Sequence, residues 1–414
     1  MTERAPLHIF GGFGVEMEYM IVASDTLDVL PVADKVLEAQ AGELTDEVDV
    51  GPLAWSNELV LHVIEMKTNG PTPVLPGVAA QFQQQVQQIN AHLKPLGGQL
   101  MPGAMHPWMD PHTQTKLWPH GQNEIYAAYD RIFSCKGHGW SNLQSTHINL
   151  PFADDDEFGK LHAAIRLILP LLPAIAAASP VKDGMVTGLM DTRLDVYRTN
   201  QAKLPSISGQ VVPEPLWTRA AYEGQLLQKI YDDIRPHDVD NILQFEWLNS
   251  RGAIARFDRH AIEIRTIDIQ EHPAADIAIV TATVAVLKAL VAGRWAPLAA
   301  QQALGTGELS THWREAIRDG ERAVIADADY LGCIGMPRGR HTLQEIWQHL
   351  LAEVWPTDAD AAVTAAKDVI LQDGPLSRRI TAALGSSTPS REQLVAVWRQ
   401  LCTCLATGES FVSL

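Results

Sequence analysis

Residues 12–22 read GFGVEMEYMIV, an apolar run that is interrupted by two carboxylates. Side chains alternate between the two faces of a β-strand. A strand over residues 13–22, opened by the glycines of GGFG, therefore places Glu16 and Glu18 on one face and the apolar side chains on the other. The segment predicts a strand that carries charged ligands within an otherwise apolar pattern.

Three further segments repeat this pattern of a charged or imidazole group inside an apolar strand. They are WSNELVLHVIEMKTNG (55–70, with Glu58 and Glu65), LQSTHINLPF (143–152, with His147 and Asn149) and AIEIRTIDIQ (261–270, with Glu263 and Arg265). Burying a carboxylate without a partner costs free energy. Carboxylates that converge also repel one another unless cations bind between them. Because Mg²⁺ and Mn²⁺ prefer such hard oxygen ligands, the sequence predicts a metal site that gathers these segments.

The spacing within the second segment leaves one question open. Glu58 and Glu65 are seven residues apart, and a regular strand would send them to opposite faces. Either a bulge lies between them or Glu58 precedes the strand within residues 59–68.

Each candidate also has an ordinary structural interpretation. Glu263 and Arg265 could simply pair with neighbouring strands, and a histidine such as His147 is often a hydrogen-bonded core residue. The histidines of the loop MPGAMHPWMDPHTQTKLWPHG (101–121) match no helical zinc motif. The joint pattern of ligands, rather than any single residue, favours a metal site.

Composition limits the classes of partner. The 414 residues carry a formal net charge of −17, which disfavours nucleic acid and anionic membranes as partners. It does not exclude a nucleotide, since magnesium can lie between carboxylates and phosphates. No signal peptide is visible, the four cysteines favour reduced thiols, and the two most apolar stretches are interrupted by Arg166 and Lys288. We therefore expect a cytoplasmic protein whose apolar stretches are buried helices.

The remaining pattern predicts one integrated α+β domain over residues 1–414, with a sheet-bearing core at 9–272 and a mainly helical portion at 273–414. Helices are expected over residues 78–93, 126–132, 156–178 (kinked by prolines) and 218–233, and strands over 144–150, 242–248 and 261–269.

The candidate residues suit phosphoryl chemistry. Arg265 shares a strand face with Glu263, so a guanidinium and a metal ion could hold the same phosphoryl group. The sequence shows neither a Gly-rich P-loop nor a defensible Ser-His-Asp or Cys-His nucleophile. A nucleotide site here would depend on metal ions.

Five motifs in order resemble the glutamate–cysteine ligase family of the carboxylate–amine ligase type. They are GVEME, NELVLHVIEMKT, the HPW loop at His106, QSTHIN and AIEIR, and they cover roughly residues 9–272. The resemblance implies a curved antiparallel β-sheet of the glutamine synthetase catalytic-domain type, flanked by helices. It also implies ATP and magnesium (or manganese) ions on the concave face.

The resemblance further implies a set of functional residues. Metal ligands would be Glu16, Glu18, Glu58, Glu65, His147 and Glu263; His147, Asn149 and Arg265 would contact the nucleotide; Arg265 and Glu263 would be catalytic; Arg198, Ser208 and His106 would bind substrate. The implied reaction is ATP-dependent amide formation, in which glutamate or a similar acid becomes an acyl phosphate that an amine such as cysteine then attacks.

Other functions stay open at this point. The same carboxylates could activate water in a metal-dependent hydrolase of γ-glutamyl or similar amide bonds, or serve a non-catalytic nucleotide- or metal-binding regulator. A guanidino kinase has the same sheet architecture but no support in the motifs. The acceptor amine and the oligomeric state are not predicted, and a homo-oligomer is compatible with the sequence.

Overall fold

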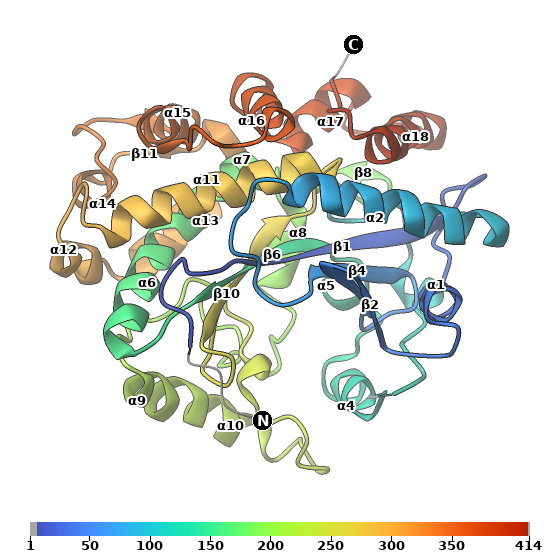
Figure 1. Ribbon diagram of the computed structural model, residues 1–414, viewed down its shortest axis with the longest axis horizontal. Coiled ribbons are helices and arrows are strands. Elements are labelled where there is room, and N and C mark those ends of the chain that lie inside the picture. The colour runs from blue at the N-terminus through green and yellow to red at the C-terminus, as the bar shows by residue number, and fades with distance from the viewer. Residues whose placement is uncertain (1–5, 122, 413–414) are drawn as a thin grey trace.

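The computed structural model describes residues 6–121 and 123–412, which combine helices with antiparallel sheet (Figure 1). The main sheet is eight-stranded and all its pairings are antiparallel, in the order β2-β3-β4-β1-β6-β10-β9, with β5 also paired to β1. Its strands are β1 (Gly14–Ala23), β2 (Glu47–Val50), β3 (Leu53–Asn57), β4 (Val63–Thr68), β5 (Gly98–Met101), β6 (Ser145–Pro151), β9 (Ala253–Arg256) and β10 (Ala261–Asp268). Two two-stranded sheets, β7 (Val181–Lys182) with β8 (Met185–Val186) and β11 (Val324–Ile325) with β12 (His341–Thr342), lie apart from it.

Helices fill most of the remaining chain. Between the strands of the main sheet lie α1 (Ala33–Ala41), α2 (Val78–Leu93), η1 (Lys94–Leu96), α3 (Pro111–Gln114), α4 (Asn123–Phe133), α5 (His138–Ser141), α6 (Asp155–Ile168), η2 (Leu169–Leu171), α7 (Pro173–Ala176), α8 (Thr192–Tyr197), α9 (Arg219–Ala221), η3 (Tyr222–Leu227), α10 (Gln228–Ile234) and η4 (Glu246–Leu248). After the sheet come α11 (Pro273–Val291), α12 (Leu298–Ala303), α13 (Thr306–Asp319), η5 (Gly320–Arg322), α14 (Ala328–Cys333), α15 (Leu343–Val354), α16 (Ala361–Asp373), α17 (Leu376–Leu384) and α18 (Arg391–Thr407).

The alternation in the first strand produces the predicted two-faced sheet. Val15, Met17 and Tyr19 are fully buried on one face of β1, while Glu16 and Glu18 point to the other. Helices α2 and α11 lie across the apolar face, and α15–α18 form a further layer outside them (Figure 1). Helix α11 is long and apolar enough to span a membrane, but 89% of that apolar window is buried inside the protein, which makes it a core helix.

The register of the sheet sets the candidate ligands directly opposite one another. Glu18 on β1 faces Glu65 on β4, and Glu16 faces His147 on β6. On the next pair of strands, Glu263 of β10 lies opposite Asn149. Directly paired residues have Cβ atoms about 4.5–5.5 Å apart, so segments separated by up to 250 positions in sequence form one polar surface.

The second segment forms two strands rather than one. Strands β3 and β4 pair with each other, and Glu58 lies in the connection between them, before β4 begins. Of the two explanations for the seven-residue spacing, the second is correct: Glu58 precedes the strand that carries Glu65. Strand β3 was missed because only the residues after Glu58 were assigned to a strand.

Three other predicted elements need correction. The helix expected over 156–178 ends at Ile168 and continues as η2 and α7, because Pro170 and Pro173 cannot donate the hydrogen bonds of a continuous helix. Residues 242–248 form a loop and the short η4 instead of a strand, and the strand that pairs with β10 is β9, which lies between the two segments predicted as strands. The helix over 218–233 is present but contains the π-helical segment η3.

Helix α11 is fixed to the sheet through one buried carboxyl group. Asp276 accepts hydrogen bonds from Thr146 Oγ1 of β6 (2.6 Å), the Gln270 backbone N–H (3.0 Å) and the Tyr19 hydroxyl of β1 (3.4 Å). Burial raises the pKa of Asp276 to about 8. This group joins α11 to the apolar side of the two strands that carry Glu16 and His147.

We predict that Asp276→Ala lowers the free energy of unfolding by about 2 kcal/mol, because it leaves buried donors without an acceptor. Urea denaturation monitored by circular dichroism measures the change. As a control, the exposed Asp373 at the end of α16 should tolerate the same substitution within about 0.5 kcal/mol. Equal stability of the two variants would show that Asp276 does not fix α11.

Candidate functional site

Four glutamates from strands β1 and β4 and their neighbouring connection converge on the polar face of the sheet. Ligand atoms of Glu16, Glu65 and His147 lie within 4.8 Å of one another, and so do ligand atoms of Glu18, Glu58 and Glu65. Glu65 belongs to both triads. The structure therefore brings together five of the six residues expected to bind metal, in two overlapping groups.

His147 links the carboxylates of this cluster. Its Nδ1 lies 3.0 Å from Glu16 Oε2, and its Nε2 lies 2.9 Å from Ser145 Oγ, which in turn donates to Glu18 Oε2 (2.9 Å). Burial alone would lower the pKa of His147, but the hydrogen bond to Glu16 and the charge of Glu18 raise it above its ordinary value. The reverse effect holds for Glu16: burial would raise its pKa, yet the His147 hydrogen bond and charge lower it to about 2.

The carboxyl groups of Glu65 and Glu58 are not compensated by His147 in this way. Burial and the charge of Glu16 raise the pKa of Glu65 to about 7, although Lys67 (3.4 Å) and the Ser56 hydroxyl (2.8 Å) oppose the shift. Burial and the charges of Glu18 and Glu65 raise the pKa of Glu58 well above its ordinary value. A divalent cation would replace the protons that these two groups otherwise hold near neutral pH.

Glu263, the sixth expected ligand, occupies a different position. Its Oε1 lies 2.7 Å from Arg265 Nε and 3.8 Å from His147 Nδ1, and its Oε2 lies 3.9 Å from Arg256. Glu263 is thus an ion-pair partner of two arginines at the edge of the triads. Burial alone would lower the pKa of Arg265, but the charge of Glu263 raises it above its ordinary value, which keeps this guanidinium charged.

Asn149 reaches the site because its neighbour on β1 has no side chain. Asn149 Nδ2 donates to Glu16 Oε1 (2.9 Å), opposite His147. A Cβ atom on Gly14, its partner in register, would lie 2.8 Å from the Asn149 Cβ. Gly14, one of the glycines of GGFG, therefore provides the space in which Asn149 packs and orients Glu16.

Two cavities meet over the carboxylate cluster. The larger cavity, about 1480 Å³, lies over Glu16, Glu65, Lys67, Asn149 and Glu263. The smaller, about 530 Å³, extends towards α4 and η4. The residues that line both cavities are Glu18, Glu58, His147, Arg256, Arg259 and Arg265. The charged cluster is thus the junction between two spaces, the larger of which exceeds the volume of a typical small-molecule pocket.

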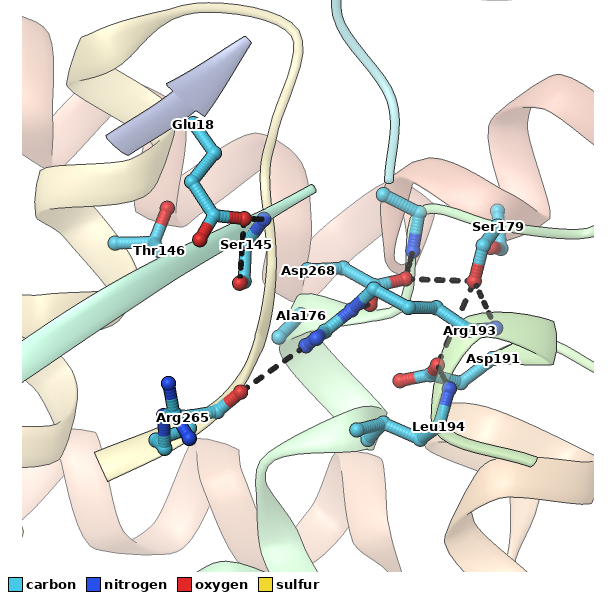
Figure 2. Close-up of polar contacts among 12 residues, drawn as sticks. Glu18, Ser145, Thr146, Ala176, Ser179, Asp191, Arg193, Leu194, Arg265 and Asp268 are labelled. Carbon is cyan, nitrogen blue, oxygen red and sulfur yellow. Dashed lines mark hydrogen bonds and ion pairs between the residues drawn. The ribbon is translucent and has the colours of Figure 1, made fainter. Parts of the chain in front are cut away.

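Sequence reasoning missed Arg193, a fully buried arginine at the wall of the smaller cavity. Figure 2 shows it between Asp268 and the backbone carbonyl of Arg265: Nε pairs with Asp268, and Nη2 donates to the carbonyl (3.3 Å). Ser179 donates to the same Asp268 (2.8 Å) and to Asp191 (3.4 Å). Because this network holds the guanidinium in one orientation, Arg193 is suited to bind an anionic group in the cavity.

Three residues expected to bind substrate lie elsewhere. His106 is buried in the HPW loop, where Nε2 is hydrogen-bonded to the Leu27 carbonyl (2.8 Å), so its position corresponds to a structural role. Arg198 is exposed and paired with Asp195 (2.9 Å), outside the lining of both cavities. Ser208 is buried one layer behind the smaller cavity, where its hydroxyl donates to Gln201 (3.2 Å).

Simple alternation could have found some of the missed residues. Lys67 follows Glu65 by two positions, and Ser145 precedes His147 by two, so each shares the face of a recognised residue. Arg256 lies on β9, which was not recognised as a strand. Arg193 had no signal of its own, because its position depends on the distant Asp268.

Comparisons with known proteins agree with this architecture. The family model described as glutamate-cysteine ligase family 2 matches residues 12–397. An uncharacterized protein from Archaeoglobus fulgidus is 30% identical over 399 residues, which cover 96% of this chain and all of that protein. Among solved structures, glutamate–cysteine ligase from Francisella tularensis in complex with AMP superimposes with a TM-score of 0.59 at 11% identity, covering 97% of this chain and 90% of that one. The structure of a bifunctional glutathione synthetase from Pasteurella multocida superimposes with a TM-score of 0.54 at 14% identity, and the match covers 94% of this chain and 52% of that one. At these identities the two structures show a shared fold.

We predict that, without divalent cations, the protein loses stability as pH rises from about 5 to about 8. The pKa of Glu65 is raised from 4.5 to about 7, so in this window the folded state keeps a proton that the unfolded state has released, and stability falls with rising pH. Millimolar MgCl₂ should raise the Tm more at pH 8 than at pH 5, because the cation replaces that proton.

Differential scanning fluorimetry across this pH range measures both effects. Glu65→Gln should weaken the pH dependence and the response to magnesium, whereas the exposed Glu43→Gln should change neither. A Tm that does not change with magnesium at any pH would contradict a cation site here.

Proposed function

Because the chain belongs to glutamate-cysteine ligase family 2, we propose that it is an ATP-dependent carboxylate–amine ligase. It would join glutamate, or a similar acid, to an amine through an acyl phosphate, with release of ADP and phosphate. The observation that carries this proposal is the pair of overlapping carboxylate triads at the junction of two cavities. Such an arrangement suits phosphoryl transfer between a nucleotide on one side and an acceptor on the other.

The donor set fits Mg²⁺ or Mn²⁺. One triad has two carboxylates and one imidazole, the other has three carboxylates, and neither includes a thiolate. Their shared residue Glu65 has a raised pKa, and a bound cation would lower it. Bound magnesium would neutralise charge on the phosphates of ATP and hold them at the junction. To serve as a ligand, His147 would release the proton that its carboxylate neighbours favour.

The protein's own groups would position the reactants. The larger cavity would take the nucleotide, with its γ-phosphate at the junction, where Arg265 offers a charged guanidinium. The acid would enter from the smaller cavity, because the attacking and leaving oxygens lie in line on opposite sides of the transferring phosphorus. Arg193, held by Asp268, would orient the acid through a second carboxylate.

The reaction then needs no enzyme nucleophile. A carboxylate oxygen bonds to the γ-phosphorus as the bond to ADP breaks. The amine nitrogen next bonds to the acyl carbon as the carbon–oxygen bond to phosphate breaks. The carboxylate, an ammonium ion and ATP thereby yield the amide, ADP, phosphate and one proton. Positioning and charge neutralisation account for most catalysis in phosphoryl transfer, and the cluster provides both.

Two finer structural points belong to the same proposal. We infer that the antiparallel sheet is the curved sheet of the glutamine synthetase catalytic type, and that residues 1–414 form a single domain. A connected cluster of buried apolar side chains that extends from Phe13 to Phe411 supports the second point. Small-molecule substrates, rather than nucleic acid, fit the net charge of −17.

We predict that purified protein releases ADP from ATP and MgCl₂ only when glutamate and an amine are both present. Glu16→Gln and Glu263→Gln should each lower kcat at least about 100-fold, because they remove charge at the phosphoryl site. A coupled ADP assay measures turnover, and circular dichroism verifies folding. The matched variant Glu43→Gln should retain full activity. Hydrolysis of γ-glutamyl amides without nucleotide would instead identify a metal-dependent hydrolase.

A further inference from the structure

Away from the junction, the lining of the smaller cavity changes from charged residues to a set that includes several aromatic side chains. The residues it shares with the larger cavity are all charged or imidazole. The residues found only in the smaller cavity include five aromatic side chains, here called the aromatic chamber: Tyr126, Tyr129, Trp140, Tyr197 and Trp247. We propose, on the basis of the ligase function above, that the amine substrate carries an aromatic ring and that this ring binds in the aromatic chamber.

Three rings of the chamber contact one another. The Tyr129 ring centroid lies 5.2 Å from Trp140 and 6.0 Å from Trp247, with the ring planes tilted by 49° in both pairs. Behind them, Phe133 stacks against Trp140 at 5.5 Å, and Phe245 stacks against Trp247 at 5.7 Å. These spacings are in the range where aromatic pairs attract one another. A flat substrate ring would therefore join an existing set of contacting rings.

Unpaired polar atoms in the chamber also indicate a ligand. Within the described part of the chain, Trp140 Nε1 and the Tyr197 hydroxyl are buried without a hydrogen-bond partner. Buried polar groups in folded proteins are nearly always paired, and both residues line the cavity. A substrate with hydrogen-bonding groups beside its ring would offer partners to these atoms once the Trp140 or Tyr197 side chain rotates towards the cavity.

The position of the chamber selects the amine rather than the acid or the nucleotide. The acid must meet the γ-phosphate at the charged junction, and the larger cavity is needed for ATP. The amine attacks the acyl carbon and must approach from the remaining space, which is the aromatic chamber. A small amine such as cysteine would leave these apolar walls in contact with water.

A purely structural role for these rings does not explain why they are only partly buried. Core aromatic residues such as Tyr222 are fully buried, whereas Trp140, Tyr197 and Trp247 are only partly buried and face the cavity. A ligand whose only charge is an ammonium group is also disfavoured, because four arginines and only two glutamates line the same cavity. An aromatic amine that also carries a carboxylate fits both the rings and the arginines.

The test compares amines in the ADP-release assay with glutamate, ATP and MgCl₂. The probes are L-phenylalanine, L-tryptophan and tryptamine against L-cysteine and glycine, so that the pair tryptophan and tryptamine separates amino acids from simple amines. We expect kcat/KM for at least one aromatic amine to exceed that for cysteine by about tenfold, because a tenfold preference corresponds to about 1.4 kcal/mol, within the range for one aromatic pair.

Variants assign this preference to the chamber. Trp247→Leu should raise KM for the aromatic amine about tenfold while glutamate KM stays within about twofold, and Trp247→Phe should restore most of the loss. Trp295→Leu, outside both cavities, serves as the matched control.

Cysteine or glycine as the best substrate of the wild-type protein would overturn the aromatic-amine inference and leave the ligase function intact. Absence of ADP release with every amine would count against the ligase function itself. Because the wild-type amine panel decides the preference, the outcome does not depend on the folding of any variant.

Discussion

The mutual repulsion of carboxylates on one sheet face is the constraint on which the site depends. Glu16, Glu18, Glu58 and Glu65 meet in two overlapping groups, in which Glu18 and Glu65 are buried and Glu16 and Glu58 are half-buried. His147 compensates Glu16, and Ser145 donates two hydrogen bonds to Glu18 (2.8 and 2.9 Å). The raised pKa values of Glu58 and Glu65 show that this compensation is incomplete. Like charges so placed hold protons or cations, and the proposed ATP-dependent ligase function would require the cations.

The opposite face of the same strands maintains this arrangement. The apolar side chains between the ligands pack under α2 and α11, and Asp276 fixes α11 to β1 and β6. At the far end of β10, Asp268 holds Arg193 against the wall of the smaller cavity (Figure 2). Rigid packing on one side therefore keeps repelling charges in position on the other, which is the kind of preorganisation that catalysis of phosphoryl transfer demands.

Period-two alternation was enough to predict the central strands and most of the cluster. It placed Glu16, Glu18, Glu65 and His147 on strands, and pairing in the sheet brought their segments together. It failed where position depends on tertiary contacts. Arg193 was passed over in favour of Arg198, five residues later, because sequence spacing does not show which arginine Asp268 holds. His106 was expected at the substrate because of its motif, but its ring stabilises the loop through the Leu27 carbonyl. The aromatic chamber combines residues of α4, α5, α8 and η4, whose proximity no local pattern reveals.

The location of bound metal tests the central claim most directly. Crystals of the protein soaked in MnCl₂ and ATP, measured by anomalous diffraction at the manganese edge, would locate each ion. The account predicts two ions on the polar face of the sheet, one in each carboxylate triad, with Glu65 contacting both. Manganese absent from this cluster, or bound only at other sites while Glu58 and Glu65 contact no ion, would contradict it.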